Sequence, residues 1–263
     1  MQKIHEYGGF RVDLNELSKL FYVIYNNPDL KNKDLELETG FGKNKIENLK
    51  YYLRHFNLLN KDYSSSDFAK IVYTYDKYFE DEATLWMLFY HWTEKNSNPF
   101  LYYLINESIG IKTKEELYKD FSSWAYENDI KTEYDKKDFV GGLISRTLNS
   151  FTELGAFKGL NIFTLQSSRY SRDIPYKMNT LLVAYILYYS QHGRTTISFE
   201  ELLKEHNNIG KIFNLNRDTL QQQIYAMRDI GLTHYVQTAN LQHIVYTHRE
   251  SPLKLLQRYY EQY

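Results

Sequence analysis

The feature that most constrains the fold is a repeated order of two amphipathic helices separated by a short segment containing glycine. In the first part of the chain, Asp13 is expected to cap a helix through Asn27, and another helix is expected from Lys43 to about Leu59. Apolar residues recur at steps of three and four in both, at Leu14, Leu17, Phe21 and Ile24 and at Ile46, Leu49, Leu53 and Phe56. Residues 32–42 between them predict a short helix and a glycine turn. This order is typical of a helix-turn-helix unit, and residues 60–67 leave room only for a small wing.

The same order returns in the last part of the chain and is followed there by a hairpin. Ser198 and Glu201 have capping-box spacing, and Asn216 is expected to cap a helix that runs to Ile230 and ends at Gly231. The other expected elements are a helix over 177–189, a strand over 195–197, strands over 232–238 and 241–247 around Ala239-Asn240, and a helix after Pro252. Helices followed by a hairpin predict a second winged-helix-like unit.

The middle of the chain is expected to be helical. The acidic run Glu80-Asp81-Glu82 suits the start of a helix to about Thr93, and Thr113 with Glu116 opens a helix to about Asn128. A further helix is expected from about Asp135 to Phe151, and a strand pair within 159–176. The predicted fold is therefore mostly α (α+β with small β-hairpins). It consists of winged-helix-like units at 1–78 and 177–263, joined by a helical region at 79–176.

Composition restricts the kind of protein this is. Hydrophobic residues make up 43% of the chain, enough for real cores, and the net charge of -1 means that only a local patch can attract nucleic acid. Without cysteine there can be no disulfide, zinc-thiolate site or cysteine nucleophile. The 26 tyrosines fit either codon bias in an AT-rich genome or an aromatic recognition surface. Neither a membrane span nor a signal peptide is evident, so a cytoplasmic protein with no membrane partner is expected.

No pattern in the sequence predicts catalysis. The phosphate-binding G-x-x-x-x-G-K-[ST] and G-x-G-x-x-G patterns are missing, and the histidines do not have metal-ligand spacing. Three nuclease-like D-x-K triplets begin at Asp29, Asp129 and Asp135, in predicted loops or helix starts, and such a short pattern is expected by chance. We therefore predict no catalytic residue, no metal and no small-molecule cofactor.

Three stretches of sequence resemble the bacterial family known as domain of unknown function 4007. The first runs from Gly40-Phe41-Gly42-Lys43-Asn44 to Tyr51-Tyr52-Leu53, and the second is Glu82-Ala83-Thr84-Leu85-Trp86-Met87-Leu88. The third is Ser198-Phe199-Glu200-Glu201-Leu202-Leu203, followed by Gly210-Lys211-Ile212-Phe213 and by Pro252-Leu253 to Tyr259-Tyr260. Together they span roughly residues 40–262 in order. The resemblance implies a bacterial gene near sulfur-transfer and phage-defence or DNA-modification genes, and it implies no activity.

The helix from Lys43 carries the candidate binding residues. Opposite its apolar face we expect Asn44, Asn48, Tyr51 and His55, and on one flank Lys43, Lys50 and Arg54. Between Gly42 and Lys61 five cations accompany one acid, Glu47, which gives a local charge of +4. Cations neutralise phosphates, and amides or phenols pair with base edges, so these seven residues are the predicted DNA-binding residues. A solvated helix face in a protein-docking domain explains the same pattern.

The long helix of the last unit predicts docking rather than DNA contact. Leu220, Ile224, Met227 and Ile230 are expected to be buried, which leaves Asp218, Gln222, Tyr225 and Asp229 outside, where carboxylates repel phosphate. The sequence thus favours a non-enzymatic DNA-binding or adaptor subunit of a bacterial phage-defence or DNA-modification complex, with double-stranded DNA and proteins as partners. The alternatives are a protein-interaction scaffold with no DNA contact and an enzyme with an unrecognised site.

Overall fold

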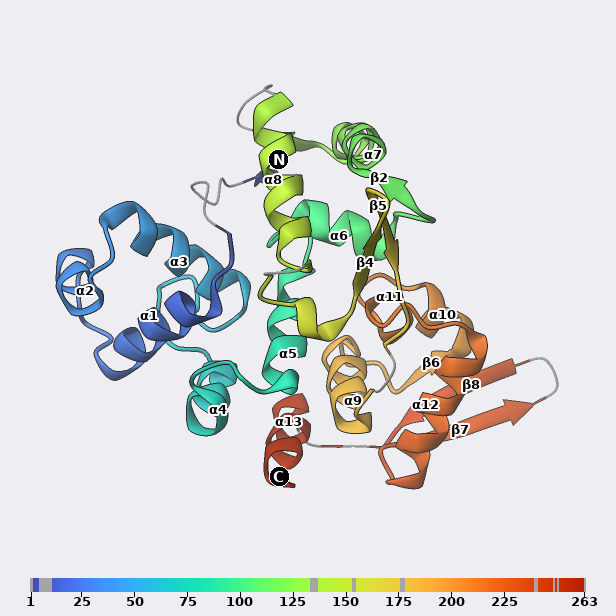
Figure 1. Cartoon of the computed structure of the whole chain (residues 1–263). Coiled ribbons are helices and arrows are strands. Elements are labelled where there is room, and N and C mark those ends of the chain that lie inside the picture. Colours follow the sequence, from blue (N-terminus) through green and yellow to red (C-terminus); the bar gives the residue numbers. More distant parts are fainter. Residues whose placement is uncertain are drawn as a thin grey trace. The chain divides into compact units, whose positions relative to one another are not determined.

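The computed structural model describes residues 2–4, 11–132, 137–152, 155–175, 178–238, 241–247, 249 and 251–262 (Figure 1). The chain forms two compact units, Met1–Asp173 and Ile174–Tyr263. The described sheets are small, and none has more than three strands. The prediction of a mostly helical α+β protein is confirmed. The threefold division of the chain stays a prediction.

The first unit begins with a group of helices packed on one another (Figure 1). They are α1 (Leu14–Asn26), α2 (Asn32–Thr39) and α3 (Lys43–His55), and α4 (Asp67–Asp76) follows in the chain. The Asp13 side chain accepts hydrogen bonds from the backbone N–H groups of Asn15 and Glu16, as expected for an N-cap. Gly40 ends α2 with φ of 72°, a left-handed conformation that glycine adopts without a steric penalty. The expected turn between α2 and α3 is therefore present.

The end of α3 differs from the expectation. The helix stops at His55 rather than near Leu59, because Asn57 turns into the left-handed region at φ of 58° and the N–H groups of Leu58 and Leu59 both return to the Leu53 carbonyl. Asparagine tolerates this conformation better than most residues do. The segment predicted to be a small wing contains one antiparallel bridge, between Leu59 and Ser65.

The rest of the first unit is helical with two small sheets. Its helices are α5 (Glu82–Trp92), α6 (Pro99–Asn106), α7 (Lys114–Glu127), α8 (Lys137–Asn149) and the short 3-10 helix η1 (Lys158–Leu160). β1 (Gln2–Ile4) pairs in parallel with β3 (Ile130–Thr132). β2 (Lys112–Thr113), β5 (Arg169–Arg172) and β4 (Phe163–Gln166) form an antiparallel sheet in that order. The expected strand pair is thus present as β4 and β5, whereas β1, β2 and β3 were not expected.

Aromatic side chains connect α3 to α5 and to the segment after α8. The ring of Phe56 lies 5.6 Å from that of Trp92 and 5.9 Å from that of Phe157, in edge-to-face geometry. Phe151 stacks on Phe157 at 5.5 Å and meets Phe163 of β4 at 5.0 Å. These buried rings form a continuous core that connects the end of α3 with β4.

The second unit has the predicted order of elements. It contains α9 (Thr180–Tyr189), β6 (Thr196–Ser198), α10 (Phe199–Lys204), α11 (Ile209–Ile212), α12 (Arg217–Asp229), β7 (Thr233–Thr238), β8 (Leu241–Tyr246) and α13 (Pro252–Tyr260). The sheet has the order β6-β8-β7, and α9 packs against α12 and α13. Leu220, Ile224 and Met227 are buried as expected. The turn at Ala239-Asn240, like the helix starts expected at Asp135 and Lys177, lies outside the described residues.

Ile230 is a correction to the predicted core. Its side chain is 46% exposed, although the helical spacing placed it with Leu220, Ile224 and Met227. α12 ends at Asp229, and the chain then turns at Gly231, which has φ of 74°. Ile230 therefore no longer follows the buried stripe of the helix.

Among the described residues, no helix has both the length and the apolar character that crossing a membrane requires.

Candidate nucleic-acid interface

The buried face of α3 agrees with the prediction. Ile46, Leu49, Leu53 and Phe56 are all buried. Tyr52 is buried with them, because its ring lies against Trp92 of α5, 6.0 Å away. The apolar stripe is therefore wider than the spacing of the four predicted residues indicated.

The widened stripe removes Asn48 from the predicted outward strip. Asn48 precedes Tyr52 by one helical turn, so it lies on the same side of α3, and it is only 5% exposed. Its Oδ1 atom is buried without a hydrogen-bond partner among the residues that the structure describes. The prediction that Asn48 faces a groove is wrong.

The other members of the strip keep some exposure. Asn44 is exposed, and Tyr51 and His55 are half-buried, with their rings tilted against each other at 4.7 Å. Asn44, Tyr51 and His55 thus remain at the surface of α3, whereas Asn48 supports the helix from inside.

Two of the predicted local cations are already partly neutralised. Lys45 forms an ion pair with Glu16 of α1, and Lys43 lies 3.9 Å from Glu47 in an exposed pair one turn along the helix. Exposed pairs of this kind are weak, so Lys43 can exchange its partner easily. Lys45, at less than one-third exposure, ties α3 to α1.

Lys50 and Arg54 both lie close to the ring of Tyr63, which belongs to the loop of residues 60–64; we call this segment the wing loop. The Lys50 Nζ atom is 5.3 Å from the centre of the Tyr63 ring, and the Arg54 guanidinium carbon is 5.2 Å from it. Arg54 also donates a hydrogen bond of 3.5 Å to the Tyr63 hydroxyl. Within the described part of the chain, neither cation has a carboxylate within ion-pair distance. We call these three residues the Lys50–Tyr63–Arg54 cluster.

The backbone of Tyr63 has an unfavourable conformation. Its φ is 67°, in the left-handed region that a bulky side chain rarely adopts. The loop holds it there through the N–H of Tyr63, which donates to the Asn60 carbonyl, and through Asp62, which accepts from the backbone and hydroxyl of Ser64. The Tyr63 side chain is 43% exposed. Strain of this kind collects at binding sites, and no pattern in the sequence singled out Tyr63.

Lys50 is fixed more firmly than Arg54. Its Nζ atom donates a hydrogen bond of 2.7 Å to the Asn32 side chain at the start of α2. Partial burial lowers the pKa of Lys50 from its usual value, and the nearby Glu47 charge acts in the opposite direction. The amine therefore has a set position beside the ring of Tyr63.

α12 of the second unit carries the expected acidic residues on its surface. Asp218, Gln222 and Asp229 are exposed, and Asp229 accepts two hydrogen bonds from Arg228. Tyr225 is half-buried beneath the same guanidinium, 4.7 Å from its ring centre. This helix offers mixed charge rather than a cationic face.

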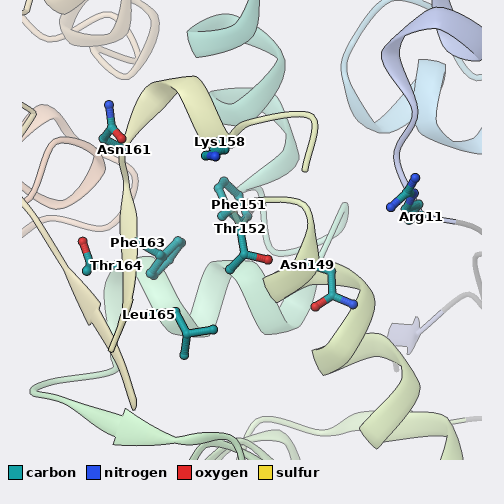
Figure 2. Close-up of a pocket in the computed structure, with 9 residues that line it drawn as sticks. All are labelled: Arg11, Asn149, Phe151, Thr152, Lys158, Asn161, Phe163, Thr164 and Leu165. Atoms are coloured by element: carbon teal, nitrogen blue, oxygen red, sulfur yellow. The ribbon is translucent and has the colours of Figure 1, made fainter. Parts of the chain in front are cut away.

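A pocket of about 510 Å³ lies elsewhere in the first unit, between the end of α8, η1 and β4 (Figure 2). It is lined by Arg11, Asn149, Phe151, Thr152, Lys158, Asn161, Phe163, Thr164 and Leu165. Figure 2 shows Lys158, Phe151 and Thr152 near the middle of the view and Arg11 at one side. We call it the 149–165 pocket.

The described residues contain no group of three or more histidine, aspartate or glutamate side chains that could hold a metal ion.

One of the three nuclease-like D-x-K triplets does not lie in a loop as the sequence predicted. Asp129 directly precedes β3, and Ile130 and Lys131 belong to that strand. Asp29 lies in a turn, and Asp135 lies outside the described residues.

The class of protein is therefore a mostly α-helical one with two small antiparallel sheets and a cluster of two half-buried cations beside an exposed tyrosine. Residues 6–141 and 149–260 match the family described as "Protein of unknown function (DUF4007)". The chain belongs to this family, as the resemblance indicated.

Solved structures with the same fold include two of a protein called SspB. The first is 15% identical in sequence, with a TM-score of 0.80, and the match covers 99% of this chain and 89% of that one. The second, a magnesium-bound form, is 16% identical with a TM-score of 0.78 and the same coverage. At these identities the likeness describes the fold. No curated protein matches the sequence.

Proposed function

We propose that this chain is a non-enzymatic DNA-binding or adaptor subunit of a bacterial phage-defence or DNA-modification system. Its first unit contacts double-stranded DNA through α3 and the wing loop, in the manner of a winged helix. The Lys50–Tyr63–Arg54 cluster carries the proposal, because it places two cations, without carboxylate partners among the described residues, beside an exposed ring. Phosphates are the anions that such cations neutralise on DNA.

Each part of the surface has a distinct role in this proposal. Lys50 and Arg54 contact phosphates, and Lys43 joins them by leaving its weak pair with Glu47. The exposed amide of Asn44 reaches base edges, and Tyr51 and His55 line the same side of α3. Tyr63 contacts both cations, so in this proposal the wing loop helps to position the phosphate contacts.

A binding measurement on the full chain tests the role of Tyr63. We expect Tyr63→Asn to keep the loop folded, because asparagine accepts left-handed φ, and to weaken binding to duplex DNA severalfold because the cations lose their support. Tyr126→Asn is the matched control, since Tyr126 is 86% exposed on α7. Equal affinity of wild type and Tyr63→Asn would remove the cluster from the interface.

The second candidate function is a protein-interaction scaffold. It is favoured by the pairing of Lys45 with Glu16, by the burial of Asn48 and by the exposed acids of α12. Exposed tyrosines in the first unit, at Tyr22, Tyr75 and Tyr78, also suit protein contacts. A wild-type protein that shows no salt-dependent binding to duplex DNA at about 50 mM salt, where phosphate contacts are strong, would favour the scaffold.

The non-enzymatic part of the proposal has its own test. Purified protein is incubated with plasmid DNA or with ATP, with and without magnesium. We expect neither substrate to be hydrolysed. Hydrolysis that a single point mutation in this chain abolishes would overturn this part of the proposal and leave the DNA contact untouched.

A further inference from the structure

The 149–165 pocket has an unusual balance of charge. Among the residues that the structure describes, its lining includes two cations, Arg11 and Lys158, and no carboxylate. Within the described residues neither cation has an acidic partner at ion-pair distance. The carboxylate of Asp173, which is not among the lining residues, accepts a hydrogen bond from the hydroxyl of Thr164. The pocket therefore presents two positive charges.

Neutral polar groups and an apolar floor complete the lining. Asn149, Thr152 and Asn161 supply amides and a hydroxyl that can donate hydrogen bonds to phosphate oxygens and sugar hydroxyls, whereas the Thr164 hydroxyl already donates to Asp173 and can only accept. Phe151 and Phe163 are buried below them, and Leu165 is 46% exposed at one side. Apolar surface with a few placed polar groups is the usual composition of a small-molecule site.

The wall of the pocket is fixed by its backbone. Gly155 packs so closely that a Cβ atom there would lie 2.4 Å from the Asn149 carbonyl oxygen. The N–H of Phe157 donates to the Ser150 carbonyl, and that of Gly155 donates to the Thr152 carbonyl. These contacts close the turn that carries Thr152 and Lys158. These hydrogen bonds restrict the backbone on this side of the pocket, which lowers the entropic cost of ordering it around a ligand.

We propose that the 149–165 pocket binds a phosphate monoester of nucleotide size. A monoester carries about two negative charges at neutral pH, which match the charges of Arg11 and Lys158. A phosphodiester carries only one negative charge, so each phosphate of a continuous nucleic-acid backbone matches the two cations less well. The volume of about 510 Å³ falls in the range of about 300–1,000 Å³ that small-molecule sites occupy. The shared chemistry is found in a free mononucleotide and at the 5′-phosphorylated end of a nucleic-acid strand.

The test is isothermal titration of the full chain with three ligands that share one base and sugar. AMP has a monoester, 3′,5′-cyclic AMP has a diester, and adenosine has neither. We expect AMP to bind most tightly and adenosine least. Equal affinity for AMP and adenosine, or no binding of any phosphate ligand at millimolar concentration, would overturn the proposal.

Substitutions of the two cations test whether AMP binds in the 149–165 pocket. Arg11→Gln and Lys158→Gln should each weaken AMP binding about tenfold, as expected for the loss of one charge-assisted contact. Lys254→Gln is the matched control, because Lys254 is exposed on α13 of the second unit. AMP affinity that neither pocket variant changes would contradict the proposal.

A further comparison distinguishes a free nucleotide from the 5′-phosphorylated end of a strand as the ligand. A 5′-phosphorylated single-stranded oligonucleotide is compared with its 5′-hydroxyl form. Binding of the phosphorylated strand in preference to AMP supports a strand end as the ligand, and the reverse supports a free nucleotide. The triple variant Lys43→Ala, Lys50→Ala, Arg54→Ala should bind AMP as the wild type does. Failure of the pocket and failure of the α3 interface are thus distinguishable.

Discussion

Lys50 Nζ donates a hydrogen bond of 2.7 Å to Asn32 Oδ1, and this bond joins α3 to the first residue of α2. The lysine thereby has a neutral partner, which positions the amine without cancelling its charge. Lys45, one helical turn and a half earlier, is neutralised by Glu16 instead. Of the two, Lys50 keeps its charge available for an anionic partner.

The cations of α3 that are proposed to contact phosphates should determine how DNA binding depends on salt. Each phosphate contact contributes about 0.9 to the slope of log affinity against log salt, so replacing Lys43, Lys50 and Arg54 by alanine should flatten the slope by up to roughly 3 units. Binding to all sequences should weaken together. Asn44→Ala should instead change the preference among sequences by about 1–3 kcal/mol if the amide contacts a base. Fluorescence anisotropy at several salt concentrations measures both.

The control for this series is the acidic face of α12. Replacing Asp218 and Asp229 by alanine should leave DNA affinity no weaker, because carboxylates do not hold phosphates. A loss of affinity in this double variant equal to that of the triple variant would mean that the surface of α3 has no special role.

Asn48 offers a prediction about stability. Its Oδ1 atom is buried and has no hydrogen-bond partner among the described residues. Asn48→Leu, with a side chain of similar size, should be neutral or stabilising, whereas Asn48→Asp should cost about 3 kcal/mol or more because it buries an unpaired charge. Urea denaturation measures the two effects. Asn48→Leu should also bind DNA as the wild type does, and weaker binding would return Asn48 to the interface.

Gly210 should not tolerate a side chain. A Cβ atom at this position would lie 2.4 Å from the Leu202 carbonyl oxygen and 2.6 Å from Leu203 Cα, so α10 and α11 would have to separate. We expect Gly210→Ala to destabilise the second unit by about 1–3 kcal/mol or more. Gly159→Ala is the control, since no atom lies within 4 Å of its Cβ position, and it should change stability by less than about 1 kcal/mol. Thermal unfolding compares them, and similar losses in both variants would contradict the close approach of α10 and α11.

The buried imidazole of His91 predicts a loss of stability on acidification. Burial lowers the pKa of His91 below its ordinary value of 6.5, although Glu94, 3.7 Å from Nδ1, acts in the opposite direction. Below pH 6.5 the unfolded chain therefore binds a proton that the folded chain does not. Stability is retained above this pH, falls as the pH drops towards the lower folded pKa, and then levels off.

His91→Gln should remove this part of the pH dependence. Urea midpoints at about pH 7.5 and about pH 5.5 bracket the ordinary histidine pKa. The wild type should lose more stability between them than His91→Gln does. The exposed His234 provides the control variant His234→Gln, which should follow the wild type. A pH dependence in His91→Gln as steep as that of the wild type would show that other groups cause it.

Local signals in the sequence were sufficient for most of the longer helices and for the caps predicted for them, although α4, α6 and α11 were not predicted. Asp13, Thr113, Ser198 and Asn216 accept the backbone hydrogen bonds that their positions predicted, because capping depends only on residues within one turn. Local signals did not predict that Asn48 and Tyr52 are buried. Their burial depends on Trp92, which is distant in the sequence, so the helical spacing alone could not reveal it.

Tyr63 and the 149–165 pocket were beyond sequence reasoning for the same reason. The ring of Tyr63 became part of a cluster only because the wing loop folds back along α3. Arg11 and Lys158 line one pocket although almost the whole first unit separates them along the chain. Residues that meet only through the tertiary fold, such as Tyr63 with the cations of α3 or Arg11 with Lys158, have no spacing pattern that can be recognised in one sequence.

The sheet β2-β5-β4 has a consequence for the order of events during synthesis. β4 and β5 form a local hairpin, whereas Lys112 of β2 must wait for Tyr170 of β5 to leave the ribosome. Closing so long a loop costs more conformational entropy than closing a hairpin and is therefore slower. We therefore expect β2 to be made early but paired late, so nascent chains cut short before residue 169 should be degraded faster than chains that include β5.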